Sequence, residues 1–279
     1  MEEERLDSWE EFVKAVERLR ANTNGNGAYL LFRGQANAHW KLETTWERGG
    51  YPNIPIRHYL SDALIVKDEV EILTNQKWSV SPEELNKPFS SPDLLTRFLD
   101  APIHGFDYLS YLRQHGFPSP LLDWTRSIFI AAFFTFQNIV EKGDDAAIYV
   151  LDARGPHLKS AGAFPSIFRF GARNGGHRRH FMQQGEYTIC VHWQKHESWG
   201  EHLWHIASHD ISITESGKLQ DNQVIKKFIL PSKERLRVLD ILNEQNINAY
   251  TLFGTEEGIM QTLANRQFSH YLRPKPSVD

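Results

Sequence analysis

The chain has 279 residues, of which 41% are hydrophobic and 24% charged, as in ordinary globular proteins. Its formal net charge of −4 excludes a global attraction to nucleic acid or to anionic membranes, although a local basic patch remains compatible with it. The single cysteine, Cys190, excludes an intrachain disulfide and a cysteine-based zinc site. No hydrophobic run reaches membrane-spanning length, and the acidic N-terminal segment is not typical of a signal peptide. We therefore expect a cytoplasmic protein with no membrane partner.

The N-terminal part predicts a helix followed by a strand. Ser8 to Glu11 form a capping box, which predicts a helix over 8–21, and the Asn/Gly cluster 22–27 ends it. The apolar run that begins at Ala28 predicts a buried strand that ends in Arg33 and Gly34. A guanidinium keeps its proton, so Arg33 must be paired or must emerge into a cleft, and a structural ion pair with a carboxylate is the simpler alternative.

The next segment predicts short elements and one long helix. We expect a strand over 39–42, a turn at Gly49 and Gly50, a helix over about 56–73, a loop or lid over 79–92 and mostly helix over 93–114.

A second informative block runs from His115 to Ser127. Pro118 and Pro120 predict an extended approach, after which Asp123 or Thr125 caps a very apolar helix over 128–136. The N-terminus of such a helix favours an anion.

The C-terminal half mixes strands and helices. We expect strands over 146–151, 223–230 and 249–252, helices over 232–242 and 254–267, irregular structure over 155–176 and an exposed excursion over 197–208. No regular βαβ alternation occurs, so the fold class is α+β, with a mixed or antiparallel central sheet and flanking helices. We expect a single domain over 1–279, with a core over 28–263.

Two local clusters have open interpretations. The basic cluster Arg169, Arg173, Arg178 and Arg179 fits a solvated surface and a phosphate clamp about equally well. Five histidines fall between residues 192 and 209, and His202 and His205 could share a helix face as part of a metal site. Histidines at the surface or packed on aromatic rings are the favoured alternative, and no metal site is predicted.

The blocks occur in an order that resembles the FRG domain family, named for its Phe-Arg-Gly motif. Phe32-Arg33-Gly34-Gln35, Trp40-Lys41-Leu42 with Arg48, Leu121 to Thr125, Gln184-Gly185 and the strand before Pro231 carry the resemblance, over about 9–263. The family pattern usually has Thr-Arg before Leu-Leu-Asp, where this chain has Ser119-Pro120, and Arg126 is a possible substitute. The association of FRG domains with bacterial and phage proteins implies a role in conflict or defence.

A looser resemblance is to the NAD-binding core of ADP-ribosyltransferases, which also opens with a strand ending in aromatic-Arg-Gly. It implies an ADP-ribosyltransferase-like fold with NAD as substrate. In those enzymes a late Glu or Gln completes the site. In chain order its counterpart here is Gln184, Glu186 or Glu257, with Glu186 preferred as the acid. It implies catalytic roles for Glu186, Thr125 and Asp123, and NAD contacts from Arg33, Gly34, Gln35, Trp124, Arg126, Ser127 and Gln184.

Three functions therefore follow as hypotheses. The first is an NAD-consuming enzyme, either an ADP-ribosyltransferase with a protein or nucleic-acid target or an NAD glycohydrolase. The second is a non-catalytic module that binds a nucleotide or nucleic acid. The third is a metal-dependent nuclease that holds Mg²⁺ with Asp123, Glu186 and histidines, although no carboxylate pair has a diagnostic spacing.

Overall fold

The computed structural model describes residues 2–21, 29–92, 105–138, 144–153, 165–170, 178–198, 200–210, 225–268 and 271. Its centre is an eight-stranded mixed sheet in the order β1-β8-β4-β2-β3-β6-β5, with β7 also paired to β6. The strands are β1 Glu2–Arg5, β2 Leu30–Gln35, β3 Leu121–Thr125, β4 Ala146–Asp152, β5 Ser166–Phe170, β6 Gly185–Lys195, β7 His202–Ile206 and β8 Ile225–Leu230. β1 runs parallel to β8, and the other described pairs are antiparallel. The predicted α+β class is confirmed.

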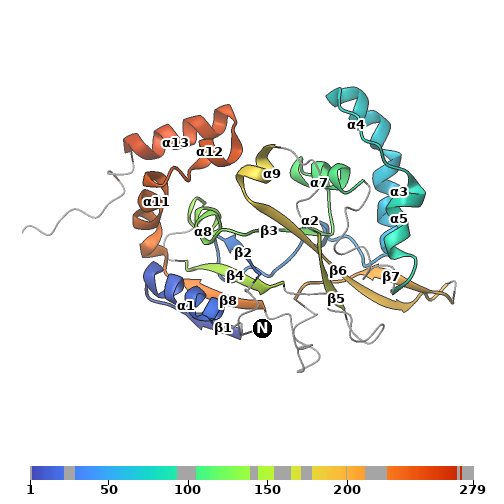
Figure 1. The fold of residues 1–279 in the computed structure, drawn as a ribbon, viewed down its shortest axis with the longest axis horizontal. Coiled ribbons are helices and arrows are strands. Elements are labelled where there is room, and N and C mark those ends of the chain that lie inside the picture. The colour runs from blue at the N-terminus through green and yellow to red at the C-terminus, as the bar shows by residue number, and fades with distance from the viewer. Residues whose placement is uncertain are drawn as a thin grey trace, which may run out of the picture.

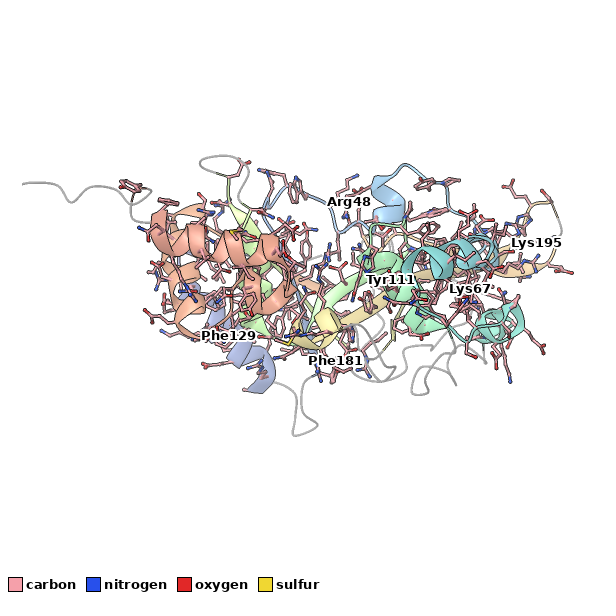
Figure 2. All side chains as sticks on the ribbon, turned by 90° about the horizontal axis from the view of Figure 1, so that it is seen from above. Arg48, Lys67, Tyr111, Phe129, Phe181 and Lys195 are labelled. Carbon is pink, nitrogen blue, oxygen red and sulfur yellow. The ribbon has the colours of Figure 1, made fainter. Side chains whose placement is uncertain are left out.

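Helices gather at both ends of this sheet (Figure 1). At one end lie α1 (Trp9–Ala21), α11 (Arg235–Glu244), α12 (Ala249–Phe253) and α13 (Glu256–Phe268). At the other end lie α3 (Ile56–Ile65), α4 (Lys67–Thr74) and α5 (Pro82–Asn86). Between them lie α2 (Thr45–Arg48), α7 (Phe106–Gln114), α8 (Ile128–Phe136) and α9 (Arg178–Met182), and two short 3₁₀ helices cover Lys87–Phe89 and Ser232–Glu234. Seen from above, Phe129 on α8 and Lys67 on α4 lie toward opposite ends of the molecule (Figure 2).

The two faces of the sheet bury different clusters because successive side chains of a strand point to opposite sides. Phe32 and Val150 face α8 and α1 in one cluster, whereas their chain neighbours Leu31 and Tyr149 belong to a cluster on the other face. A third cluster packs α3 and α7 against β6 and β7. The sheet is therefore covered on both faces, and its functional groups must come from strand ends or gaps between strands.

Most elements with a strong local signal form where they are predicted. α1 begins after Ser8, as the capping box predicts, and buries Phe12 and Val16. β2, β4, β8, α8 and α13 also form close to their predicted positions. Cys190 is fully buried in β6, as expected for a small apolar residue.

Several predicted elements are wrong. Residues 39–42 form a turn, a bend and irregular backbone rather than a strand, and the helix predicted over 56–73 divides into α3 and α4 at Val66. The loop predicted over 79–92 contains α5, because the Ser81 side chain accepts a hydrogen bond from the Glu84 backbone and starts a helical turn. The strand predicted over 249–252 is helix α12, because Asn248 and Thr251 form a capping box there.

The exposed excursion predicted over 197–208 is also wrong. It contains β7, whose Leu203 and Trp204 are buried against β6. His202 and His205 lie on this strand, so their spacing of three directs their side chains to opposite faces rather than to one helix face. The predictions for 22–27, for 93–104 and for most of 155–176 lie outside the described residues. The part of the last range that the structure describes contains β5.

Among the described residues, none of the helices combines the length and apolarity that crossing a bilayer requires.

Candidate functional site

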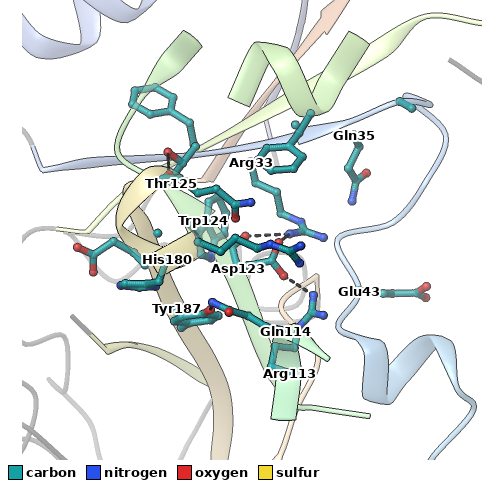
Figure 3. A pocket seen from close by; sticks show the side chains of 18 of the residues that line it. Arg33, Gln35, Glu43, Arg113, Gln114, Asp123, Trp124, Thr125, His180 and Tyr187 are labelled. Carbon is teal, nitrogen blue, oxygen red and sulfur yellow. Dashed lines mark hydrogen bonds and ion pairs between the residues drawn. The ribbon is translucent and has the colours of Figure 1, made fainter. Parts of the chain in front are cut away.

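The candidate site lies where the sheet opens between β2 and β3. β2 pairs with β4 through all six of its residues, but it pairs with β3 only at Phe32 and Thr125. The two strands therefore diverge beyond Phe32, and a cleft of about 810 Å³ lies beside the gap. Arg33 enters this cleft next to Asp123 (Figure 3). Trp124 and Thr125 on β3 and Gln183 and Gly185 beside β6 line the same cleft as Arg33.

Asp123 is bound by two guanidinium groups. Arg33 Nη1 lies 2.6 Å from Asp123 Oδ2 and also donates to the Asp123 carbonyl oxygen at 2.8 Å. Arg113, from α7, forms an ion pair with Asp123 Oδ1, and its Nε donates to the Leu121 carbonyl oxygen at 3.2 Å. The predicted alternative for Arg33, an ion pair with a carboxylate, is thus present in the structure. We call Arg33, Arg113 and Asp123 the central triad.

The protonation of the central triad follows from these contacts. Protein surrounds Asp123 closely enough for burial to oppose its ionisation, although its side chain is half-exposed to the cleft. The charges of Arg113 and Arg33 outweigh that effect and hold the pKa of Asp123 well below its ordinary value. Asp123 is therefore a carboxylate at neutral pH, and both of its oxygens are engaged.

A third guanidinium lies beside the central triad without a carboxylate contact of its own among the described hydrogen bonds. Arg48 Nη1 donates to the Glu43 carbonyl oxygen at 2.9 Å. Burial, followed by the charges of Arg33 and Arg113, lowers the pKa of Arg48. These like charges repel one another, and a bound anion would relieve that repulsion. Five basic side chains line the cleft against three carboxylates, so its lining is net positive: Arg33, Lys41, Arg48, Arg113 and Arg179 against Glu43, Asp123 and Glu186.

Aromatic rings line the side of the cleft next to α9 and β6. The His180 imidazole stacks on the Tyr187 ring, with centroids 5.5 Å apart and planes 9° apart. A Cβ at Gly185 would lie 2.8 Å from His180 Nδ1, so this stack requires glycine there. Burial, followed by the charge of Arg126, lowers the pKa of His180 and keeps it neutral. The Arg179 guanidinium lies 5.3 Å from the Phe253 ring at the same side.

Glu186 occupies a different environment from Asp123. Trp124 pairs with Glu186 and Asp123 with Tyr187, so the Glu186 side chain leaves the sheet on the face opposite to Asp123. The Tyr29 hydroxyl donates to Glu186 Oε1 at 2.7 Å, whereas Arg126 Nε and Arg169 Nη1 stay 3.9 and 4.0 Å away. Glu186 is 2% exposed, and its Oε2 has no hydrogen bond from any described residue.

Burial decides the protonation of Glu186. It raises the pKa of the carboxyl by more than the hydrogen bond from Tyr29 and the charges of Arg169 and Arg126 lower it. Glu186 nevertheless lines the cleft, because β6 starts at Gly185 beside it.

Other predicted site residues have structural contacts. Thr125 Oγ1 donates to the Gln183 carbonyl oxygen at 2.7 Å and accepts a hydrogen bond from the Ser127 amide at 3.2 Å. Ser127, rather than Asp123 or Thr125, caps α8 by accepting from the Ile130 amide. Gly34 allows α8 to approach, because a Cβ there would lie 2.2 Å from the Ala131 carbonyl oxygen.

The remaining predicted contacts form hydrogen bonds outside the triad, although Gln35 and Trp124 also line the cleft. Trp124 is buried, and its Nε1 donates to Thr188 Oγ1 at 2.8 Å. Gln35 Nε2 donates to the Lys41 carbonyl oxygen at 3.1 Å, and the Gln184 carbonyl oxygen accepts from the Arg126 amide at 3.1 Å. The Arg126 side chain is half-exposed near Glu186, so the second guanidinium on Asp123 comes from Arg113 and not from Arg126. Glu257 lies on α13 and is not among the residues that line the cleft.

A comparison with protein-family models gives one match, over residues 28–144, to the FRG domain. Residues 28–144 of this chain carry an FRG domain. The matched range contains every residue of the central triad and Arg48, whereas Arg179, His180, Glu186 and Phe253 lie beyond it. No curated protein and no solved structure gives a significant match to the chain.

The central triad of this FRG domain includes a residue that sequence reasoning missed. Arg113 lies in a helix ten residues before Asp123, and no local pattern links the two. Arg48 belongs to the FRG pattern, but only the fold shows that it shares a cleft with Arg33. The described residues contain no group of three or more His, Cys, Asp or Glu side chains placed to hold a metal ion.

Proposed function

We propose that the FRG cleft binds a nucleotide through its phosphate groups, with NAD as the first candidate ligand. The observation that carries this proposal is the gathering of Arg33, Arg48 and Arg113 around a single carboxylate. Guanidinium groups present forked donors that match phosphate oxygens, and they remain charged at all physiological pH values. The cleft volume of about 810 Å³ lies within the range of sites for ligands of nucleotide size.

The aromatic side of the cleft supports the same proposal. A flat heterocycle can pack against aromatic rings, and the partly buried Phe253 lines the cleft beside the buried His180–Tyr187 stack. A nucleotide carries both kinds of group, a ring and phosphates, in one molecule.

The test is a calorimetric titration of NAD into the wild-type protein and into the variant Arg48→Met. Arg48 is suited to this purpose because it lies outside the Asp123 ion pairs, so its removal spares the central triad. Loss of one charge-assisted contact to phosphate should weaken NAD binding about tenfold or more. Arg18→Met is the matched control, because Arg18 is largely exposed on α1 and does not line the cleft. Equal affinities of the wild type and Arg48→Met would contradict the proposal.

A second candidate function is cleavage of bound NAD, as an ADP-ribosyltransferase or an NAD glycohydrolase. It is favoured by Glu186, a buried carboxyl at the cleft with one oxygen that accepts no described hydrogen bond. Cleavage of the nicotinamide–ribose bond passes through an oxocarbenium-like state, which a carboxylate stabilises. Asp123 is less suited to this role, because both of its oxygens are held by arginines.

Release of nicotinamide from NAD tests this second candidate. Glu186→Gln should lower the rate about 100-fold or more and leave NAD affinity nearly unchanged, because an amide keeps the shape and the Tyr29 contact but lacks the charge. Release that is equal in both proteins would exclude Glu186 as the catalytic group. Binding without any release would leave the non-catalytic nucleotide-binding function. A role in bacterial or phage conflict stays a prediction.

A further inference from the structure

The segment between β2 and α2 carries an exposed tryptophan into the cleft. Trp40 is 49% exposed and lines the cleft. Of the other tryptophans among the described residues, Trp9, Trp46, Trp78, Trp124 and Trp204 are at least nine-tenths buried, and Trp193 is partly buried. A single exposed ring is ordinary on a protein surface, but this one lines the cleft beside the charged groups, where the ring of a ligand can reach it.

The backbone around Trp40 is held firmly although its ring is not buried. The Tyr149 hydroxyl donates to the Trp40 carbonyl oxygen at 3.0 Å, and the Trp40 amide donates to the Asn37 carbonyl oxygen at 3.3 Å. Two residues further, Leu42 is fully buried. The ring is thus presented by a fixed segment, which lowers the entropy lost when a ligand stacks on it.

This segment lies across the central triad from the first set of rings. In Figure 3, His180 and Tyr187 lie on one side of the Arg33–Asp123 pair, and Gln35 and Glu43, which bracket the segment, lie on the other. Rings therefore line the cleft on both sides of its cationic centre. A ligand with a ring, two phosphates and a second ring carries its groups in the same order as the rings and arginines that line the cleft.

We propose that Trp40 forms a stacking subsite for one flat heterocycle of a dinucleotide whose phosphates lie on Arg33, Arg48 and Arg113. This inference rests on the proposed function, and it specifies the ligand as a dinucleotide with a ring on each side of the arginines. Stacking of a base on an aromatic side chain is sequence-tolerant and accounts for a substantial part of affinity in other nucleotide sites. The two halves of NAD offer two such rings, adenine and nicotinamide.

The test compares the affinities of NAD and of inorganic pyrophosphate for the wild type, Trp40→Ala and Trp40→Tyr. Trp40→Ala should weaken NAD about tenfold and leave pyrophosphate unchanged, whereas Trp40→Tyr should stay within about threefold of wild type. Phe268→Ala is the control, because Phe268 on α13 is 58% exposed and is not among the residues that line the cleft. It should leave both affinities unchanged.

Titrations with AMP and with nicotinamide mononucleotide identify the ring. The mononucleotide whose ring stacks on Trp40 should lose as much affinity in Trp40→Ala as NAD does, and the other should lose none. Pyrophosphate binding that survives in Trp40→Ala also shows that the variant is folded. An unchanged NAD affinity, or an equal loss for pyrophosphate, would overturn this inference while the phosphate site stands. If the wild type binds neither NAD nor pyrophosphate, the proposed function and the subsite are both overturned.

Discussion

Asp123 and Glu186 are carboxylates on neighbouring strands, one residue out of register. Their environments nevertheless shift their pKa values in opposite directions. Each has two guanidinium groups nearby, but those of Asp123 touch it, whereas those of Glu186 stay 3.9 and 4.0 Å away. The pKa of Asp123 is lowered and that of Glu186 is raised. The comparison teaches that direct contact, rather than the number of nearby charges, decides whether charge attraction outweighs desolvation.

The same difference in contacts with arginine suits the two carboxylates to different roles. Asp123 holds two arginines in place and has no oxygen left for chemistry. Glu186 keeps one oxygen without a described hydrogen bond, and burial raises the pKa of its carboxyl, which makes it the better candidate for proton transfer. One carboxylate organises the phosphate site, and the other is the candidate for reaction.

The largest expected effect is on stability and comes from Asp123→Asn. Removal of this charge leaves Arg33 and Arg113, with side chains 12% and 14% exposed, as two nearby cations without their shared counterion. Breaking a fully buried pair costs about 3–5 kcal/mol, and the half-exposed Asp123 should cost about 2 kcal/mol in the free energy of unfolding. Chemical denaturation at pH 7 measures it.

The matched variant is Glu186→Gln. It keeps an oxygen that can accept from Tyr29 and removes a charge that burial disfavours, so the free energy of unfolding at pH 7 should not fall. A loss in Glu186→Gln as large as the loss in Asp123→Asn would break the comparison between the two carboxylates.

Sequence patterns predict the parts of this site that depend on local structure. The apolar run before Arg33 predicts β2, and the prolines before Leu121 predict an extended approach that forms β3. A polar side chain at the end of a buried strand predicts a cleft there. These inferences depend only on residues close together in the chain.

The parts that were missed depend on register and on long-range contacts. Asp123 and Glu186 lie on opposite faces only because Asp123 pairs with Tyr187, and a shift of one residue would place them together. Arg113 approaches Asp123 because α7 packs beside β3, which no spacing reveals. Gly34 is an expected NAD contact from the resemblance alone, and only the fold shows that the backbone of α8 packs closely against it.

The smallest expected effect is a difference in pH dependence, which tests the protonation of both carboxylates at once. The folded pKa of Asp123 lies below its unfolded value of about 3.8, so its stabilisation is complete above that pH and is lost as pH falls toward the folded pKa. The difference in free energy of unfolding between the wild type and Asp123→Asn should therefore shrink as the pH falls below 4.

Glu186 should give the opposite slope, because its folded pKa lies above its unfolded value of about 4.5. Above that pH the unfolded state ionises first, so the wild type loses stability relative to Glu186→Gln until the folded carboxyl also ionises. The loss amounts to about 1.4 kcal/mol for each unit by which the pKa is raised. Denaturation curves of the three proteins from pH 3 to pH 8 measure both slopes. Parallel curves for the wild type and Glu186→Gln above pH 4.5 would mean that Tyr29, Arg126 and Arg169 offset the burial of Glu186 completely, and its distinction from Asp123 would then lie only in contact geometry.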